Sequence, residues 1–319
     1  MNLLIFQKES TKTFALIVAL FVIMAALEPR FVGPSNLLNI LLQISMDGIV
    51  AAGLTVVVIT GGLDLSVGSV TALSGVLFVL GLPLGIGLAG FVALLTGTFV
   101  GFVNGFLVGP GKLNSFIVTL GAMAGVQGLA LWLSRGYPIA GPGGDFEMLG
   151  GGSVLHVPLP VASYFVVLAV AQFLLTQSRF GRDLFAIGGN REAARLANIP
   201  IAYREWAAYV LCSALSAFSG MILASRLNTG SPIVGQDLPL QAIAAVVLGG
   251  TSLYGGRGGV IQTFFGILII GLLSNGLNLL NVSPAYQWSI KGSMLILVAG
   301  IDSARRKGDA CKSTLEENG

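Results

Sequence analysis

Ten apolar stretches, separated by short polar or glycine-rich segments, fill almost the whole of this 319-residue chain. Most are long enough for an α-helix to cross the roughly 30 Å of a bilayer's hydrocarbon core. They cover residues 12–28, 37–60, 66–81, 86–108, 115–134, 158–177, 205–226, 239–256, 260–280 and 285–301. The sequence therefore predicts an all-α polytopic membrane protein with about ten transmembrane helices. The third stretch is short, and its glycine-rich surroundings predict a broken or re-entrant segment near 61–85.

Composition excludes a soluble protein of this size. Charged residues make up 10% of the chain, against roughly 25% in an average soluble domain. The 45 glycines follow no collagen-like period, and in membranes small residues let helix backbones approach closely. The basic balance does not indicate nucleic-acid binding, because lysine and arginine fall in the segments between apolar stretches.

The distribution of lysine and arginine predicts the orientation. With ten helices and both ends inside, 13 basic residues are cytoplasmic and Arg30, Arg135 and Arg226 are external. This positive-inside asymmetry favours cytoplasmic termini, with a polar cytoplasmic tail at 302–319. A secretory signal peptide over the first apolar run is the less favoured alternative.

Two loops stand out by length. The external one, 135–158, is rich in glycine and proline and predicts an ordered but irregular cover. The cytoplasmic one, 177–205, contains a predicted short helix that Asn190 caps, with Glu192 in the first turn and Asn198 and Pro200 at its end. Composition alone leaves open whether this helix docks on another protein or lies on lipid headgroups.

Nothing in the chain indicates an enzyme. No GxxxxGK[ST] phosphate loop or GxSxG elbow occurs, so nucleotide or ester hydrolysis by this chain is not expected. His156 is the single histidine, and the spacing of Cys212 and Cys311 suggests neither a metal site nor a disulfide. We expect no cofactor, no metal and no catalytic residue.

Polar side chains within the apolar stretches are the candidates for a transport pathway, because such residues are unfavourable in lipid. Asn36, Asn39, Gln43 and Asp47 are spaced by three or four residues, which places them on one helix face. Later stretches contribute Asn275, Asn278, Gln287 and Lys291. The pathway is the favoured interpretation, and hydrogen bonding between helices is the alternative. We hypothesise that Asp47 and Lys291 neutralise each other or share a water-filled cavity.

The segment GGLDLSVGS at 61–69 supplies a further candidate, a gating or structural loop. Its residues are Gly61, Gly62, Asp64, Ser66 and Gly68. A helix cap or a charge at headgroup level is the main interpretation of Asp64, with gating as the lesser one.

Four segments together resemble the permease subunits of bacterial ATP-binding-cassette importers for monosaccharides, most closely the ribose-type permeases. They are NLLNILLQIS at 36–45, GGLDLSVGS at 61–69, RFGRDLFAIGGNREAARLANIPI at 179–201, and the stretch from QAIAAVVLGG to QWSIK at 241–291. The similarity covers nearly the whole chain in order. It implies a single transmembrane permease domain over 1–319 in the bacterial inner membrane.

The resemblance also implies partners. They are a separate cytoplasmic ATPase, often one chain with two nucleotide-binding domains, a periplasmic sugar-binding protein, and a second permease copy or paralogue within the lipid bilayer. The loop 177–205 matches the region that docks on the ATPase. The coupling residues are then Gly188, Gly189, Asn190, Arg191, Glu192 and Arg195. Sugar would cross by alternating access through a weakly binding polar path.

Two departures from the family pattern put the identity of the sugar in doubt. Gln241 stands where an acidic residue is usual, with Asp237 four residues earlier, and the loop 135–158 is short. Permeases for branched-chain amino acids share this architecture and remain an alternative. A secondary transporter, with Asp47 or Lys291 carrying a proton, is a second.

Overall fold

The computed structural model describes residues 2–283, 285–290, 292–293, 296 and 300, with side chains from Thr13 onward. Long helices dominate it: α1 (Asn2–Leu27), α2 (Pro34–Ile59), α3 (Val67–Gly81), α4 (Ile86–Val108), α5 (Ser115–Leu133), α7 (Leu159–Gln177), α10 (Ile201–Leu227) and α12 (Val260–Leu279). Short helices are η1 (Pro29–Val32), η2 (Leu82–Leu84), η3 (Gly144–Glu147), α6 (Met148–Gly151), α8 (Arg179–Gly189), α9 (Arg191–Leu196) and α11 (Leu238–Gly249).

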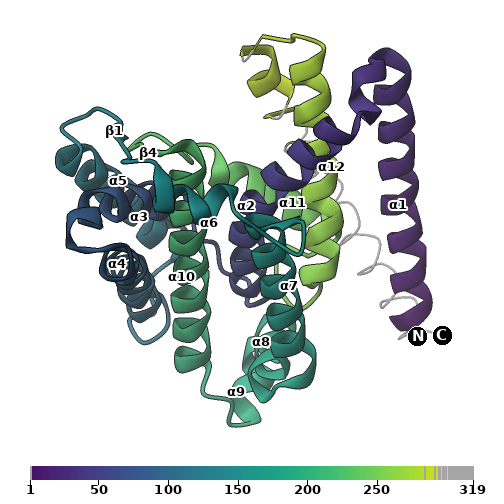
Figure 1. The fold of residues 1–319 in the computed structure, drawn as a ribbon. Helices are drawn as coiled ribbons and strands as arrows, with labels where there is room; N and C mark the ends of the chain where they lie inside the picture. The colour runs from purple at the N-terminus through teal and green to yellow at the C-terminus, as the bar shows by residue number, and fades with distance from the viewer. Residues whose placement is uncertain (1, 284, 291, 294–295, 297–299, 301–319) are drawn as a thin grey trace.

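Two small strand pairs complete the described part. Strand β1 (Ile139–Ala140) pairs antiparallel with β4 (Thr229–Gly230), and β2 (Ser153–Val154) pairs with β3 (Val157–Pro158). Helices α8 and α9 lie at one end of the bundle and the β1–β4 pair lies at the other (Figure 1). We call these the α9 end and the β1–β4 end.

The all-α polytopic fold predicted from the sequence is confirmed. Among the described residues, seven helical segments are long and apolar enough to cross a membrane, and α1 adds a shorter apolar run over Thr13–Leu27. Helix α5 is exposed along most of its length, with Phe116, Ile117 and Trp132 uncovered. An apolar helix surface of this kind suits lipid, and the chain is a multi-pass membrane protein. The predicted stretch 285–301 and the tail 302–319 lie partly or wholly outside the described residues.

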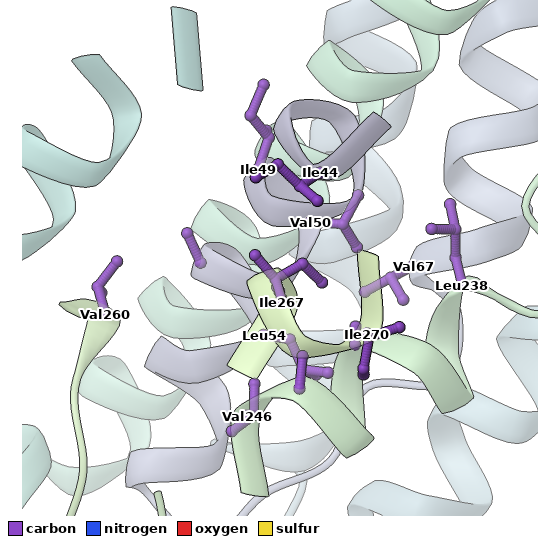
Figure 2. Packing of buried hydrophobic residues seen from close by; sticks show 14 of the residues in the cluster. Ile44, Ile49, Val50, Leu54, Val67, Leu238, Val246, Val260, Ile267 and Ile270 are labelled. Carbon is purple, nitrogen blue, oxygen red and sulfur yellow. The ribbon is translucent and has the colours of Figure 1, made fainter. Parts of the chain in front are cut away.

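Helix α2 forms the centre of the core. From Ile44 to Ile59 nearly every residue of it is buried, because α10, α12, α7 and α11 surround it. Figure 2 shows Ile44, Ile49 and Leu54 of α2 together with Val246 of α11 and Ile267 of α12 in one apolar cluster.

Glycines set the contact between α4 and α10. Gly97, Gly101 and Gly105 recur every fourth residue and therefore lie on one face of α4, and Gly109 follows four residues later as its C-cap. A side chain at each would overlap Ala217, Ser213, Trp206 and Ala202 of α10, in that order. The high glycine content thus serves close helix packing here, as expected from the sequence.

The prediction of a membrane-crossing helix over 239–256 is wrong. Helix α11 ends at Gly249, where Gly250 adopts a positive φ of 105°, and its twelve residues span only about 18 Å. Non-helical chain precedes it at 231–237 and follows it at 250–259. Apolar content alone did not reveal the break after Gly249, because the glycines that follow are not polar. The segment 231–237 already lay outside the predicted stretches.

The helix break that the sequence predicts near 61–85 lies at the start of that range. Helix α2 ends at Ile59 and α3 begins at Val67, with irregular chain between them. Residues 67–84 then continue as helix, long and apolar enough to span. The loop 60–66, exposed at Gly61 and buried at its end from Asp64 to Ser66, is therefore the interrupted part of this region.

Candidate functional site

The loop 177–205 folds as two helices rather than the single short helix predicted. Helix α9 forms where the sequence predicted it, and the Asn190 side chain caps it by accepting from the Ala193 amide at 3.0 Å. Helix α8 was missed. Its signals are the Ser178 cap, which accepts from the Gly181 amide, and buried Leu184 and Ile187 on one face.

Two ion pairs fix this helix pair to the base of α10. Arg191 forms a two-pronged contact with Glu205, whose side chain is only 5% exposed. Arg204 Nε donates to Asp183 Oδ2 at 2.7 Å. Because both pairs join α8 or α9 to α10, these three helices form one mechanical unit.

Helix α9 presents other side chains to solvent. Glu192 and Arg195 are 78% and 76% exposed and approach each other only to 3.9 Å. Leu196 is 87% exposed. An exposed leucine between charged residues on a capped helix is a surface suited to contact with another protein.

A cavity of about 770 Å³ opens beside α9. Its wall combines Arg191, Glu192 and Arg195 with Gly61 and Gly62 of the loop after α2, and with Lys112 after α4. The structure thus brings three of the predicted coupling residues and two of the predicted loop residues, which are far apart in sequence, to one cavity. Asp64, Ser66 and Gly68 do not line it.

Asp64 is fully buried, so the interpretation as a charge at headgroup level is wrong. Its Oδ1 accepts from the Ser66 amide at 2.9 Å and from the Ser66 hydroxyl at 2.6 Å, just ahead of α3. Asn104 of α4 donates to the same hydroxyl. A carboxylate at the start of α3 also interacts favourably with the positive end of the helix dipole.

The polar residues of α2 diverge in their surroundings. Asn36 exchanges two 2.9 Å hydrogen bonds with Asn275 of α12, one in each direction. This contact fits the alternative interpretation of Asn275, that it holds two helices together by hydrogen bonding rather than lining a pathway. Asn39 is exposed, and Gln43 and Asp47 are half-buried, so these three side chains keep access for a pathway role.

Asp47 has neighbours that the sequence did not suggest. It interacts electrostatically with Arg226 near the end of α10 and lies near the Tyr164 phenol of α7. Arg226 was assigned to an external segment, so sequence reasoning missed it as a partner. Lys291 lies outside the described residues, and its pairing with Asp47 stays a prediction.

Further along, Gln287 donates to Asn278 Oδ1 at 2.8 Å and to the Val282 carbonyl at 2.9 Å. These bonds close the turn after α12. Asn278 and Gln287 therefore lie together and stabilise the turn, and their role in a pathway stays a prediction.

Comparison with known proteins decides the family. The family described as branched-chain amino acid transport system / permease component matches residues 36–299. The chain belongs to this permease family. As a family member, this permease is 42% identical to the ribose import permease protein RbsC of Bacillus subtilis, over 89% of each chain. It is 38% identical to RbsC of Escherichia coli K12, over 92% of this chain and 94% of the relative.

A relative named for another pentose is similar to this permease as well. The L-arabinose ABC transporter permease protein AraH of Azospirillum brasilense is 38% identical over 90% of this chain and 85% of its own. No solved structure matches this permease. The resemblance to ribose-type permeases is confirmed by these relatives.

Proposed function

We propose that this permease is the membrane-spanning subunit of an ATP-driven importer for a monosaccharide, ribose or a related pentose. The observation that carries the proposal is the similarity to ribose and arabinose permeases over about nine-tenths of the chain. The exposed α9 surface supports it, because a subunit without a phosphate loop needs a partner to supply the energy.

The partner is a cytoplasmic ABC ATPase that docks on α9. Glu192, Arg195 and Leu196 present the contact surface, and the adjoining cavity leaves room for a segment of the ATPase. Gly188, Gly189, Asn190 and Arg191 position that surface from α8 and the α9 cap. The α9 end is then cytoplasmic, and both chain termini lie on that side of the bacterial inner membrane.

Sugar crosses by alternating access. ATP binding draws the ATPase halves together, and the α8–α9–α10 unit moves with them. Asn39, Gln43 and Asp47 of α2 line the path with Asn278, Gln287 and Lys291. The loop Gly61–Gly68 acts as a gate or support. Weak binding along the path keeps release fast. A periplasmic binding protein delivers the sugar, and a second permease copy or paralogue completes the channel.

The experiment compares substrates in proteoliposomes that contain the permease, its ATPase and its binding protein. Labelled ribose or arabinose is expected to accumulate when ATP is present with the ATPase, and labelled leucine is not. Accumulation of leucine without either pentose would instead establish the amino-acid alternative that the family description raises.

The docking step has its own test. Exchanging the charges of α9 with Glu192→Lys and Arg195→Glu should reduce co-purification of the ATPase and pentose uptake together. The matched control exchanges an exposed acid at the β1–β4 end, Asp145→Lys, and should leave both unchanged. Intact co-purification and uptake in the α9 variant would refute the docking role.

A further inference from the structure

Three glycine-rich segments that are far apart in sequence meet at one point. They are the end of α2 with Gly61, the last turn of α8 with Gly188, and the loop 250–259 with Gly255 and Gly256. The sequence marks each segment as glycine-rich, and the function proposed above gives no reason for their meeting. We call this meeting point the glycine junction.

The junction is a contact between backbones. The Gly256 amide donates to the Ile59 carbonyl at 2.9 Å, and so satisfies a carbonyl that the end of α2 would otherwise leave without a helical partner. A Cβ at Gly188 would overlap that same carbonyl oxygen and the Gly256 nitrogen. A Cβ at Gly255 would lie 2.7 Å from the Gly61 nitrogen and 2.9 Å from the Gly188 Cα.

A contact without side chains transmits movement stiffly. Displacement at an ordinary interface is partly absorbed when side chains change rotamer, and here no side chain lies between the segments. Gly188 therefore cannot move toward Ile59 without displacing α2 or the loop 250–259.

The junction also lies between the α8–α9–α10 unit and the two helices that carry most of the proposed pathway residues. On one side, α8 belongs to the unit that ion pairs tie to α9 and α10. On the other, the loop 250–259 leads directly into α12, and α12 is joined to α2 by the 2.7 Å hydrogen bond between Thr55 and Thr263. Helices α2 and α12 carry most of the proposed pathway residues, and their apolar side chains interlock (Figure 2).

We propose that the glycine junction is the mechanical link through which movement of the α8–α9 unit reaches α2 and α12. Gly188, Gly255 and Gly256 are positioning residues that couple the ATPase to the pathway and touch neither ATP nor sugar. This inference rests on the proposed function and adds the route by which force passes from one site to the other.

The test measures ribose uptake and ATP hydrolysis in the same proteoliposomes, with the permease, ATPase and binding protein present. Gly188→Ala pushes α8 away from the end of α2. It replaces no side chain of α9 or of either ion pair, and ribose carried per ATP is compared at equal amounts of bound ATPase, so that a change reports coupling rather than docking. Ribose carried per ATP should fall at least about fivefold, the lower range for coupling between two sites. The control is Gly87→Ala, in the first turn of α4, where a Cβ meets no atom within 4 Å.

A second measurement covers the case in which Gly188→Ala fails to fold. Hydrogen exchange is followed in the wild-type complex with and without a non-hydrolysable ATP analogue. Peptides containing Ile59 and Gly256 should change protection together with the α8 peptide. No change at Ile59 or Gly256 alongside a change in α8 would overturn the inference, as would unchanged ribose per ATP in a folded Gly188→Ala variant. Absence of ATP-driven ribose uptake by the wild type would count against the proposed function instead.

Discussion

The reciprocal amide pair between Asn36 and Asn275 shows how a polar side chain can be kept in a membrane protein for packing. Within the pair each amide donates once and accepts once, and the Asn36 amide also donates to the Phe31 carbonyl, so neither side chain is left unpaired between α2 and α12. Spacing along α2 placed Asn36 and Asp47 on one helix face. It did not reveal that Asn36 faces α12 whereas Asp47 interacts with Arg226, because partner identity depends on packing between distant segments.

A double-mutant cycle separates packing from transport. Asn36→Leu, Asn275→Leu and the double variant should show a coupling free energy of about 1 kcal/mol in thermal unfolding in detergent. Asn39→Ala, at an exposed position on the same helix, should leave the unfolding temperature unchanged and lower uptake. Additive stability effects of the two leucine variants would contradict the packing role.

Asp64 gives a second prediction for a single residue. Asp64→Ala removes the acceptor for the Ser66 amide and hydroxyl, so the free energy of unfolding should fall by about 1–3 kcal/mol. Asp64→Asn keeps a side-chain oxygen acceptor and should lose less. The exposed Asp145→Ala serves as the control. If Asp64→Asn abolished uptake with no loss of stability, the charge itself would act in gating.

Among the helices, those of the loop 177–205 could be predicted only in part from the sequence. Capping residues are local signals, so Asn190 located α9 correctly. The partner of Arg191 is Glu205, fourteen residues away, and the end of α11 depends on Gly250, which an apolar count treats as neutral. Local chemistry can be read from the sequence, whereas contacts between elements require the fold.

The attachment of α9 to α10 can be tested with two arginines on the same helix. Arg191→Ala leaves the buried Glu205 carboxylate without its partner, and the free energy of unfolding should fall by about 1–3 kcal/mol. Arg195→Ala alters an exposed side chain and should change it by less than about 0.5 kcal/mol. Both should weaken ATPase co-purification. Equal stability of the two variants, measured by thermal unfolding, would contradict the anchoring role of Arg191.

The loop 135–158 is ordered by contacts with residues that are distant in sequence. Asn228, in a left-handed conformation, accepts from the Gly141 amide through its carbonyl and from the Gly143 amide through its side chain. Ser225 donates to the Phe146 carbonyl and accepts from the Gly150 amide. Glycine and proline content predicted an irregular cover, and these bonds explain why it is ordered.

For the whole molecule, the central position of α2 links the observations. The glycine junction contacts its α9 end, the cavity wall begins just beyond it, and Asn39, Gln43 and Asp47 lie along it. A force applied at α9 therefore has a continuous physical route along α2 to the residues proposed to meet the sugar. In the function proposed above, the permease is a mechanical subunit whose energy comes from ATP on a partner.

The most direct test of that account is the energy source of uptake. Proteoliposomes containing the permease, its ATPase and its binding protein are loaded with ATP or given a proton gradient, and labelled ribose uptake is measured. We expect uptake with ATP on the ATPase side and none with the gradient alone or with the permease alone. Gradient-driven uptake by the permease without the ATPase would contradict the account and establish a secondary transporter.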